Sequence, residues 1–121
     1  MDLPYRELEV WRKAHRLAMD VLDLAETPRV RRVPFLRDQL SRAATSVPAN
    51  IAEGRGRRTR NDYAGFAAKA RGSVFELDYW LYLAAERQLI EDATYVALHG
   101  RAVEVSAMLA SLIDRLRSAG D

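Results

Sequence analysis

Arginine is the residue type in this sequence that is best suited to binding chemistry. Seventeen of the 19 basic residues are arginine, whose planar guanidinium group matches a phosphate in two hydrogen bonds at once. Eleven basic residues fall between Thr27 and Arg71, where the only acidic residues are Asp38, Glu53 and Asp62. We expect nine arginines of this segment to contact nucleic-acid phosphates, unless they form solvated helix faces. They are Arg29, Arg31, Arg32, Arg37, Arg42, Arg55, Arg57, Arg58 and Arg60.

A glycine-rich segment, residues 54–59, allows backbone amides to approach an anion at the start of a following helix. Its sequence, Gly-Arg-Gly-Arg-Arg-Thr, matches neither the P-loop nor the dinucleotide-binding spacing. Two interpretations stay open: the glycines end a helix and the arginines are solvated, or the segment holds nucleic-acid phosphates. Phe35 is the only aromatic residue between Pro34 and Tyr63. We therefore expect little stacking on bases and a salt-sensitive, weakly specific interaction.

The side chains that usually catalyse reactions or bind metals are few. Cysteine is absent, and neither histidine forms the Glu-x-x-His pair that di-iron bundles require. His15 falls in a predicted core stripe and is expected to be a hydrogen-bonded core residue, whereas His99 is expected at the surface. No Gly-x-Ser-x-Gly nucleophile elbow is present, and the serines are interpreted as small packing residues. The sequence predicts a protein that is not an enzyme and has no metal site and no cofactor.

Four amphipathic helices are predicted to position these residues. Apolar residues recur at spacings of three and four, and no alternating strand pattern competes with them. We expect helices at residues 5–26, 35–53, 60–87 and 92–118, with a proline-bounded loop at 27–34. Gly54 and Gly56 are expected to stop the second helix, Thr59 to cap the third, and Gly120 to follow the fourth. Because the connections are short, the fold class is all-α: residues 1–121 form one antiparallel up-down four-helix bundle.

The predicted helix at 60–87 has a second hydrophobic face. Phe75, Tyr79 and Tyr82 recur at spacings of four and three, away from the stripe expected to enter the core. A helix in an isolated bundle needs only one buried stripe. The aromatic face is therefore either a broad flank of the core or a subunit interface. A double stripe in the first helix favours a homo-oligomer.

The run Gln39–Gly56, Gln-Leu-Ser-Arg-Ala-Ala-Thr-Ser-Val-Pro-Ala-Asn-Ile-Ala-Glu-Gly-Arg-Gly, resembles the signature of the four-helix bundle family of 23S ribosomal RNA intervening-sequence proteins. Residues 8–14 resemble the first helix of that family, and residues 66–77 resemble the third. The resemblance implies a bundle that assembles into a ring, commonly a homopentamer, without catalytic residues. The family is similar to the accessory variability determinant of diversity-generating retroelements, a basic pentameric barrel associated with nucleic acid and a reverse transcriptase.

Two functional hypotheses follow. The first is a homopentameric accessory protein that binds the backbone of RNA or DNA through its arginine-rich surface. The alternative is a protein–protein scaffold or adaptor without a nucleic-acid role, with a partner such as a reverse transcriptase. The chain departs from a strongly basic barrel because its net charge is only +2. Since residues 1–7 do not resemble a signal peptide and no run of about 18 apolar residues occurs, we expect a cytoplasmic protein outside the membrane.

Overall fold

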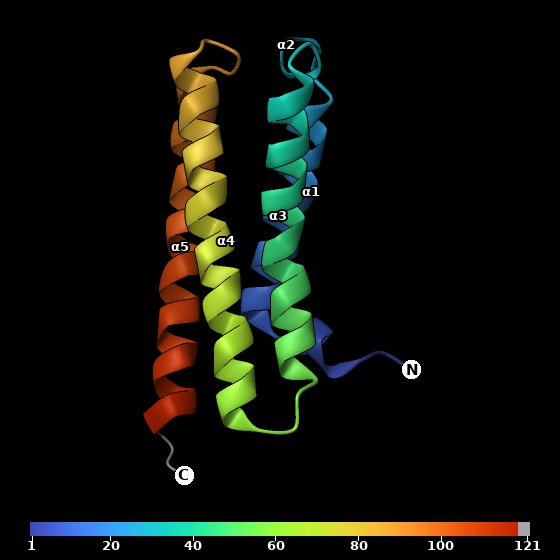
Figure 1. Cartoon of the computed structure of the whole chain (residues 1–121), viewed down its shortest axis with the longest axis vertical. Helices are drawn as coiled ribbons and strands as arrows, with labels where there is room; N and C mark the ends of the chain where they lie inside the picture. Colours follow the sequence, from blue (N-terminus) through green and yellow to red (C-terminus); the bar gives the residue numbers. More distant parts are fainter. Residues whose placement is uncertain (119–121) are drawn as a thin grey trace.

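Residues 1–118, which the computed structural model describes, form a bundle of four long helices (Figure 1). These helices are α1 (Glu9–Ala25), α3 (Pro34–Arg55), α4 (Arg60–Glu86) and α5 (Asp92–Ser118), preceded and joined by the 3-10 turn η1 (Pro4–Glu7) and the short helix α2 (Pro28–Arg31). The helix α3 packs against α1 and α4, and α5 packs against α4 and α1. The predicted all-α bundle of four main helices is confirmed. Gly120, the expected C-terminal stop, lies outside the described residues.

The prolines explain where the predicted helix boundaries were wrong. Pro28 and Pro34 were expected to keep residues 27–34 as a loop, but each lies in the first turn of a helix, α2 or α3. A proline is tolerated there because the first amides of a helix have no partner within it. Pro4 likewise begins η1, and the extended Leu8 (ψ 127°) separates this turn from α1. The helix predicted at 5–26 is therefore shorter, and the one predicted at 35–53 is longer.

Gly54 is a close-packing residue and not the helix stop that the sequence suggested. It is buried inside α3, which continues to Arg55. A Cβ atom at this position would lie 2.8 Å from the Cβ atom of Phe66 and 3.0 Å from Cδ1 of Tyr63, both on α4. The first distance is too short for carbon atoms in contact, and the second would force the Tyr63 ring to shift. The two helices therefore approach this closely because residue 54 has no side chain.

A polar contact links α3 and α4 nearer their middle. The hydroxyl oxygens of Ser46 and Ser73 lie 2.8 Å apart. The Asn50 side-chain amide donates to the Ser46 carbonyl oxygen at 2.8 Å and to the Ser46 hydroxyl at 3.0 Å. The two serines are therefore more than the small packing residues that the sequence suggested, because they pair across the helix interface.

The core between the four helices is apolar, and α5 contributes to it with only one of its sides. No polar or charged side chain is fully buried anywhere in residues 1–118. Although the sequence has no unbroken apolar run, α5 alone among the described helices has the length and the hydropathy, 1.4 over its best window, to cross a membrane. Its residues Leu98, Ala102 and Leu109 lie in the core, whereas Val96 and Val103 are exposed. The apolar residues of α5 are therefore divided between the core and an exposed outer face.

The substitution Gly54→Ala is expected to destabilise the bundle by about 1–3 kcal/mol, because the added methyl group overlaps Phe66 and Tyr63. Thermal and urea unfolding followed by circular dichroism measures the change. The matched control is Gly72→Ala on α4, where a Cβ atom meets nothing within 4 Å. This control should stabilise the protein by about 0.5–1 kcal/mol through helix propensity. Equal effects of the two substitutions would contradict the close-packing role of Gly54.

Candidate nucleic-acid interface and exposed apolar face

The structure separates the nine predicted phosphate-binding arginines into two groups at opposite ends of the bundle. In Figure 1 the turn between α3 and α4 marks the lower end, and α2 marks the upper end. The lower group is Arg55, Arg57, Arg58 and Arg60; the upper group is Arg29, Arg31, Arg32 and Arg37; Arg42 lies between them on α3. Because α3 has 22 residues, about 33 Å separates the two ends. The nine arginines therefore do not form one surface.

The lower-end arginines surround the start of α4, and all four are exposed. The predicted cap is confirmed, since the Thr59 hydroxyl accepts a hydrogen bond from the backbone N–H of Asp62 at 3.1 Å. Arg57 lies 3.9 Å from a carboxylate oxygen of Glu53 and 5.1 Å from the centroid of the Phe66 ring. Both contacts of Arg57 are long, and the Arg57 and Glu53 side chains are exposed to solvent. The four exposed arginines therefore lie beside the positive end of a 27-residue helix.

The upper-end arginines lie beside acidic and carbonyl oxygens. The Nε atoms of Arg31 and Arg37 are each 3.7 Å from the carboxylate of Glu26. Arg29 donates a long hydrogen bond, 3.5 Å, to the carbonyl oxygen of Gln88. A carboxylate that two arginines share lowers the positive potential that both present to a polyanion.

Charge also distinguishes the two ends. The lower-end segments, residues 1–16, 53–62 and 114–118, contain ten basic and six acidic residues, a net charge of +4. The upper-end segments, residues 20–38 and 86–92, contain five basic and seven acidic residues, a net charge of −2. The basic stretch of the sequence runs from one end to the other, and the fold places acidic residues beside its first part. The lower end is therefore the surface that fits a polyanion.

The three aromatic residues predicted to form an oligomer interface are exposed. Phe75, Tyr79 and Tyr82 of α4 are 58%, 54% and 49% exposed, so none of them belongs to the buried core of this chain. Val96 and Val103 of α5 are 66% and 53% exposed. An open groove of about 400 Å³, lined in part by Phe75 and Val103, runs between the two helices. These five residues define what we call the α4/α5 face, which is a candidate interaction surface.

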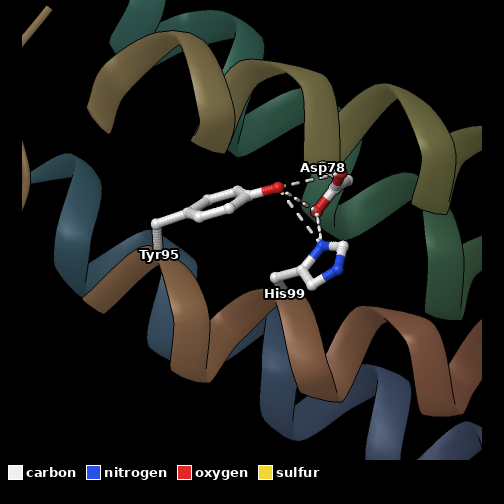
Figure 2. A network of polar contacts seen from close by, with 3 residues as sticks. All are labelled: Asp78, Tyr95 and His99. Carbon is white, nitrogen blue, oxygen red and sulfur yellow. Dashed lines mark hydrogen bonds and ion pairs between the residues drawn. The ribbon is translucent and has the colours of Figure 1, made fainter. Parts of the chain in front are cut away.

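A network of three polar side chains lies beside the groove and joins α4 to α5 (Figure 2). Nδ1 of His99 is 2.6 Å from Oδ1 of Asp78. The Tyr95 hydroxyl lies 3.3 and 3.4 Å from the two Asp78 carboxylate oxygens and 3.2 Å from Nδ1 of His99. Sequence reasoning placed His99 at the surface and missed this network. Tyr95, one helical turn before His99, was the only local signal, because Asp78 is 21 residues away.

The network holds the His99 ring in place as the carboxylate of a catalytic triad does, but the neighbouring groups do not complete a triad. Ser106 lines the same groove, and within residues 1–118 no hydrogen bond joins its hydroxyl to His99. No group of three His, Cys, Asp or Glu side chains in that part of the chain is arranged to hold a metal ion. The network is therefore a polar element within a largely apolar face.

His15 is exposed, so its predicted place in the core is wrong. Its ring stacks on Trp11 at a centroid distance of 4.8 Å and an angle of 7°. The core stripe of α1 includes Val10, Ala14 and Leu17, and Trp11 packs only against the edge of the core. The spacing suggested two buried stripes, but a helix with neighbours on one side buries only one of them completely.

Comparison with known proteins gives a match over most of the chain. Residues 6–111 match the model of the 23S rRNA-intervening sequence protein family. Among solved structures, a protein of unknown function from the S23 ribosomal protein family of Bacteroides thetaiotaomicron is 24% identical and superposes with a TM-score of 0.79. That alignment covers 86% of this chain and 97% of the other, and it supports the fold. No curated protein matches the chain.

Tyr95 is expected to make stability depend on pH in alkaline solution. Burial first, and then the Asp78 carboxylate, raise the pKa of Tyr95 above its ordinary value of 10.0. Because the folded state holds the phenol proton more tightly than the unfolded state, this contribution is complete below about pH 10 and is lost as the pH rises further. Burial also raises the pKa of Tyr63, so the comparison needs the Tyr95→Phe variant.

Urea unfolding between about pH 9 and pH 11 should show a smaller loss of stability in Tyr95→Phe than in the unaltered protein. Asp78→Asn should lower the pKa of Tyr95, measured by the absorbance of the phenolate. Parallel stability curves for Tyr95→Phe and the unaltered protein would show that folding does not raise the pKa of Tyr95.

Proposed function

Because the chain belongs to the 23S rRNA-intervening sequence protein family, we propose that it is a non-enzymatic, self-assembling accessory protein that binds the phosphates of RNA or DNA. The observation that supports phosphate binding is the concentration of four exposed arginines at the turn between α3 and α4. Two further features at the same end favour anions: the local net charge of +4 and the N-terminus of α4. Contacts to phosphates alone are independent of base sequence.

The proposal includes self-association through the α4/α5 face, with a homopentameric ring as the assembly. This face contains five of the large apolar side chains that the bundle leaves exposed. It runs along the side of the molecule, whereas the lower-end arginines lie at its tip (Figure 1). Self-association on the side leaves the phosphate-binding end open, so one chain has room for both activities.

A second candidate function is a protein scaffold or adaptor without nucleic acid. The observation that favours it is the combination of an apolar groove with the Asp78–Tyr95–His99 network, since specific protein interfaces combine apolar area with a few hydrogen-bonding groups. In this alternative the α4/α5 face binds a different protein, and the arginines contact acidic surfaces. Nuclease treatment before a pull-down distinguishes the candidates, because a direct protein partner is retained and a partner bridged by nucleic acid is lost.

The lower-end arginines are expected to determine affinity for nucleic acid. Replacing Arg55, Arg57, Arg58 and Arg60 together by glutamine should weaken binding to labelled mixed-sequence RNA at low salt. The slope of log K against log salt concentration should also become less negative, by about 0.7 for each phosphate of a single strand that the variant no longer neutralises. Fluorescence anisotropy at several salt concentrations measures both quantities.

The matched control replaces Arg29, Arg31, Arg32 and Arg37 by glutamine, which removes the same charge from the upper end. This control should bind nearly as well as the unaltered protein, with the same salt slope. The phosphate-binding proposal fails if the unaltered protein forms no complex even at low salt. Equal losses of affinity in the two variants would show that only total charge matters.

The α4/α5 face is expected to maintain the assembly. Tyr79→Glu combined with Tyr82→Glu should lower the mass measured by light scattering, because an interface buries the two charges without partners. Circular dichroism should be unchanged, since both side chains are about half exposed in the single chain. The control Ala49→Glu, on an exposed position of α3, should leave the mass unchanged. An unaltered mass in the double variant would place the interface elsewhere.

A further inference from the structure

The lower end of the bundle also holds a stack of aromatic rings. Tyr5 of η1 meets Trp11 of α1 edge to face, with centroids 4.9 Å apart and planes at 71°. His15, one turn further along α1, lies parallel to Trp11 at 4.8 Å. The turn η1 packs against α3. Figure 1 shows the N-terminal segment beside the end of α3 that leads into the turn between α3 and α4. The sequence did not show that these rings stack near that turn, because they lie more than 35 residues from it along the chain.

The outer face of this stack is open. His15 is exposed, whereas Trp11 is partly buried and packs against the core. Trp11 is the only ring that contacts His15 in residues 1–118, and no hydrogen bond of His15 is present there. One side of the imidazole ring is therefore covered by Trp11, and its other side faces solvent. Trp11 therefore supports this exposed ring from one side.

Cations accompany the rings. The guanidinium carbon of Arg6 lies 5.9 Å from the centroid of Tyr5. Arg12 donates from Nε to the carbonyl oxygen of Arg6 at 2.8 Å, which fixes it across η1, and Arg16 is exposed on the next turn of α1. Acidic residues are also present, but the lower end as a whole keeps ten basic against six acidic residues. Aromatic rings beside a positively charged surface are the combination by which proteins bind single-stranded nucleic acid.

We propose that His15, supported by Trp11, is a stacking platform for an unpaired base of a single-stranded nucleic acid whose phosphates contact the lower-end arginines. This inference rests on the proposed function and specifies its ligand as a single strand. A duplex keeps its bases stacked on one another, so it has no free base face for His15. The ligand must therefore contain unpaired nucleotides, whether it is RNA or DNA.

Tryptophan fluorescence tests the platform directly, because the chain contains two tryptophans, Trp11 and Trp80. In a Trp80→Phe background, Trp11 is the sole reporter. Adding an unstructured RNA or DNA single strand should change its emission, whereas a duplex of the same length should change it much less. The matched control is Trp11→Phe, which leaves Trp80, on the upper half of α4, as the reporter. Its emission should not respond to the single strand.

Affinity gives the second readout. His15→Ala should weaken single-strand binding about fivefold or more, the usual effect of removing one stacking side chain. The salt slope should stay unchanged, because stacking releases no counterions. His15→Phe should restore the affinity, since it keeps an aromatic ring at an exposed position. His15→Ala should not alter binding of the duplex.

The outcomes separate this inference from the function on which it rests. Three results together would refute the platform and leave phosphate binding in place: equal binding of single strands and duplexes, unchanged Trp11 emission, and normal binding by His15→Ala. If the unaltered protein binds neither ligand at low salt, both proposals are overturned. A selective loss of single-strand affinity in His15→Ala, rescued by His15→Phe, supports the platform.

Discussion

The close packing of α3 against α4 determines where the candidate functional residues lie. Gly54 allows the two helices to meet at the lower end without an intervening side chain, and Phe66 fills the space next to it. The chain must then reverse within the short segment 56–59. The residues of so short a turn cannot fold back into an apolar core, because their backbone groups need water. Arg57 and Arg58 of this turn are therefore exposed together at the tip of the bundle, beside Arg55 at the end of α3 and Arg60 at the start of α4.

The same geometry explains how a chain of net charge +2 can present a basic surface. At physiological ionic strength, exposed charges separated by more than about 8 Å are largely screened from each other. The two ends of α3 are about 33 Å apart, so the acidic upper end has little influence on a ligand at the lower end. The local charge of +4 is the relevant quantity for the proposed binding, and it depends on which helix ends lie side by side.

The helices were predictable from the sequence, whereas the neighbours of individual residues were not. Residues such as Leu77, Leu81 and Leu109 follow the helical period, and all three lie in the core. Gly54 was misinterpreted because its packing partner Phe66 belongs to the next helix. The surroundings of the two histidines could not be predicted for the same reason. Asp78 becomes a neighbour of His99 only when α4 and α5 pair. The sequence pattern of α1 does not show which flank of the helix faces solvent, and His15 lies on the exposed flank. For Phe75, Tyr79 and Tyr82 the spacing showed only that they lie outside the main core stripe, and their exposure was established by the structure.

The two proposed surfaces are compatible because they point in different directions. The α4/α5 face runs along the bundle. Cyclic symmetry about an axis parallel to the helices gives every subunit the same orientation along that axis. In the proposed ring all lower ends therefore lie on one rim, where each subunit contributes its arginines and its His15 platform. A single strand long enough to reach several subunits would bind them with a high effective concentration after the first contact. A modest affinity at each lower end is therefore sufficient, and the small charge of a single chain is no obstacle to binding a polyanion.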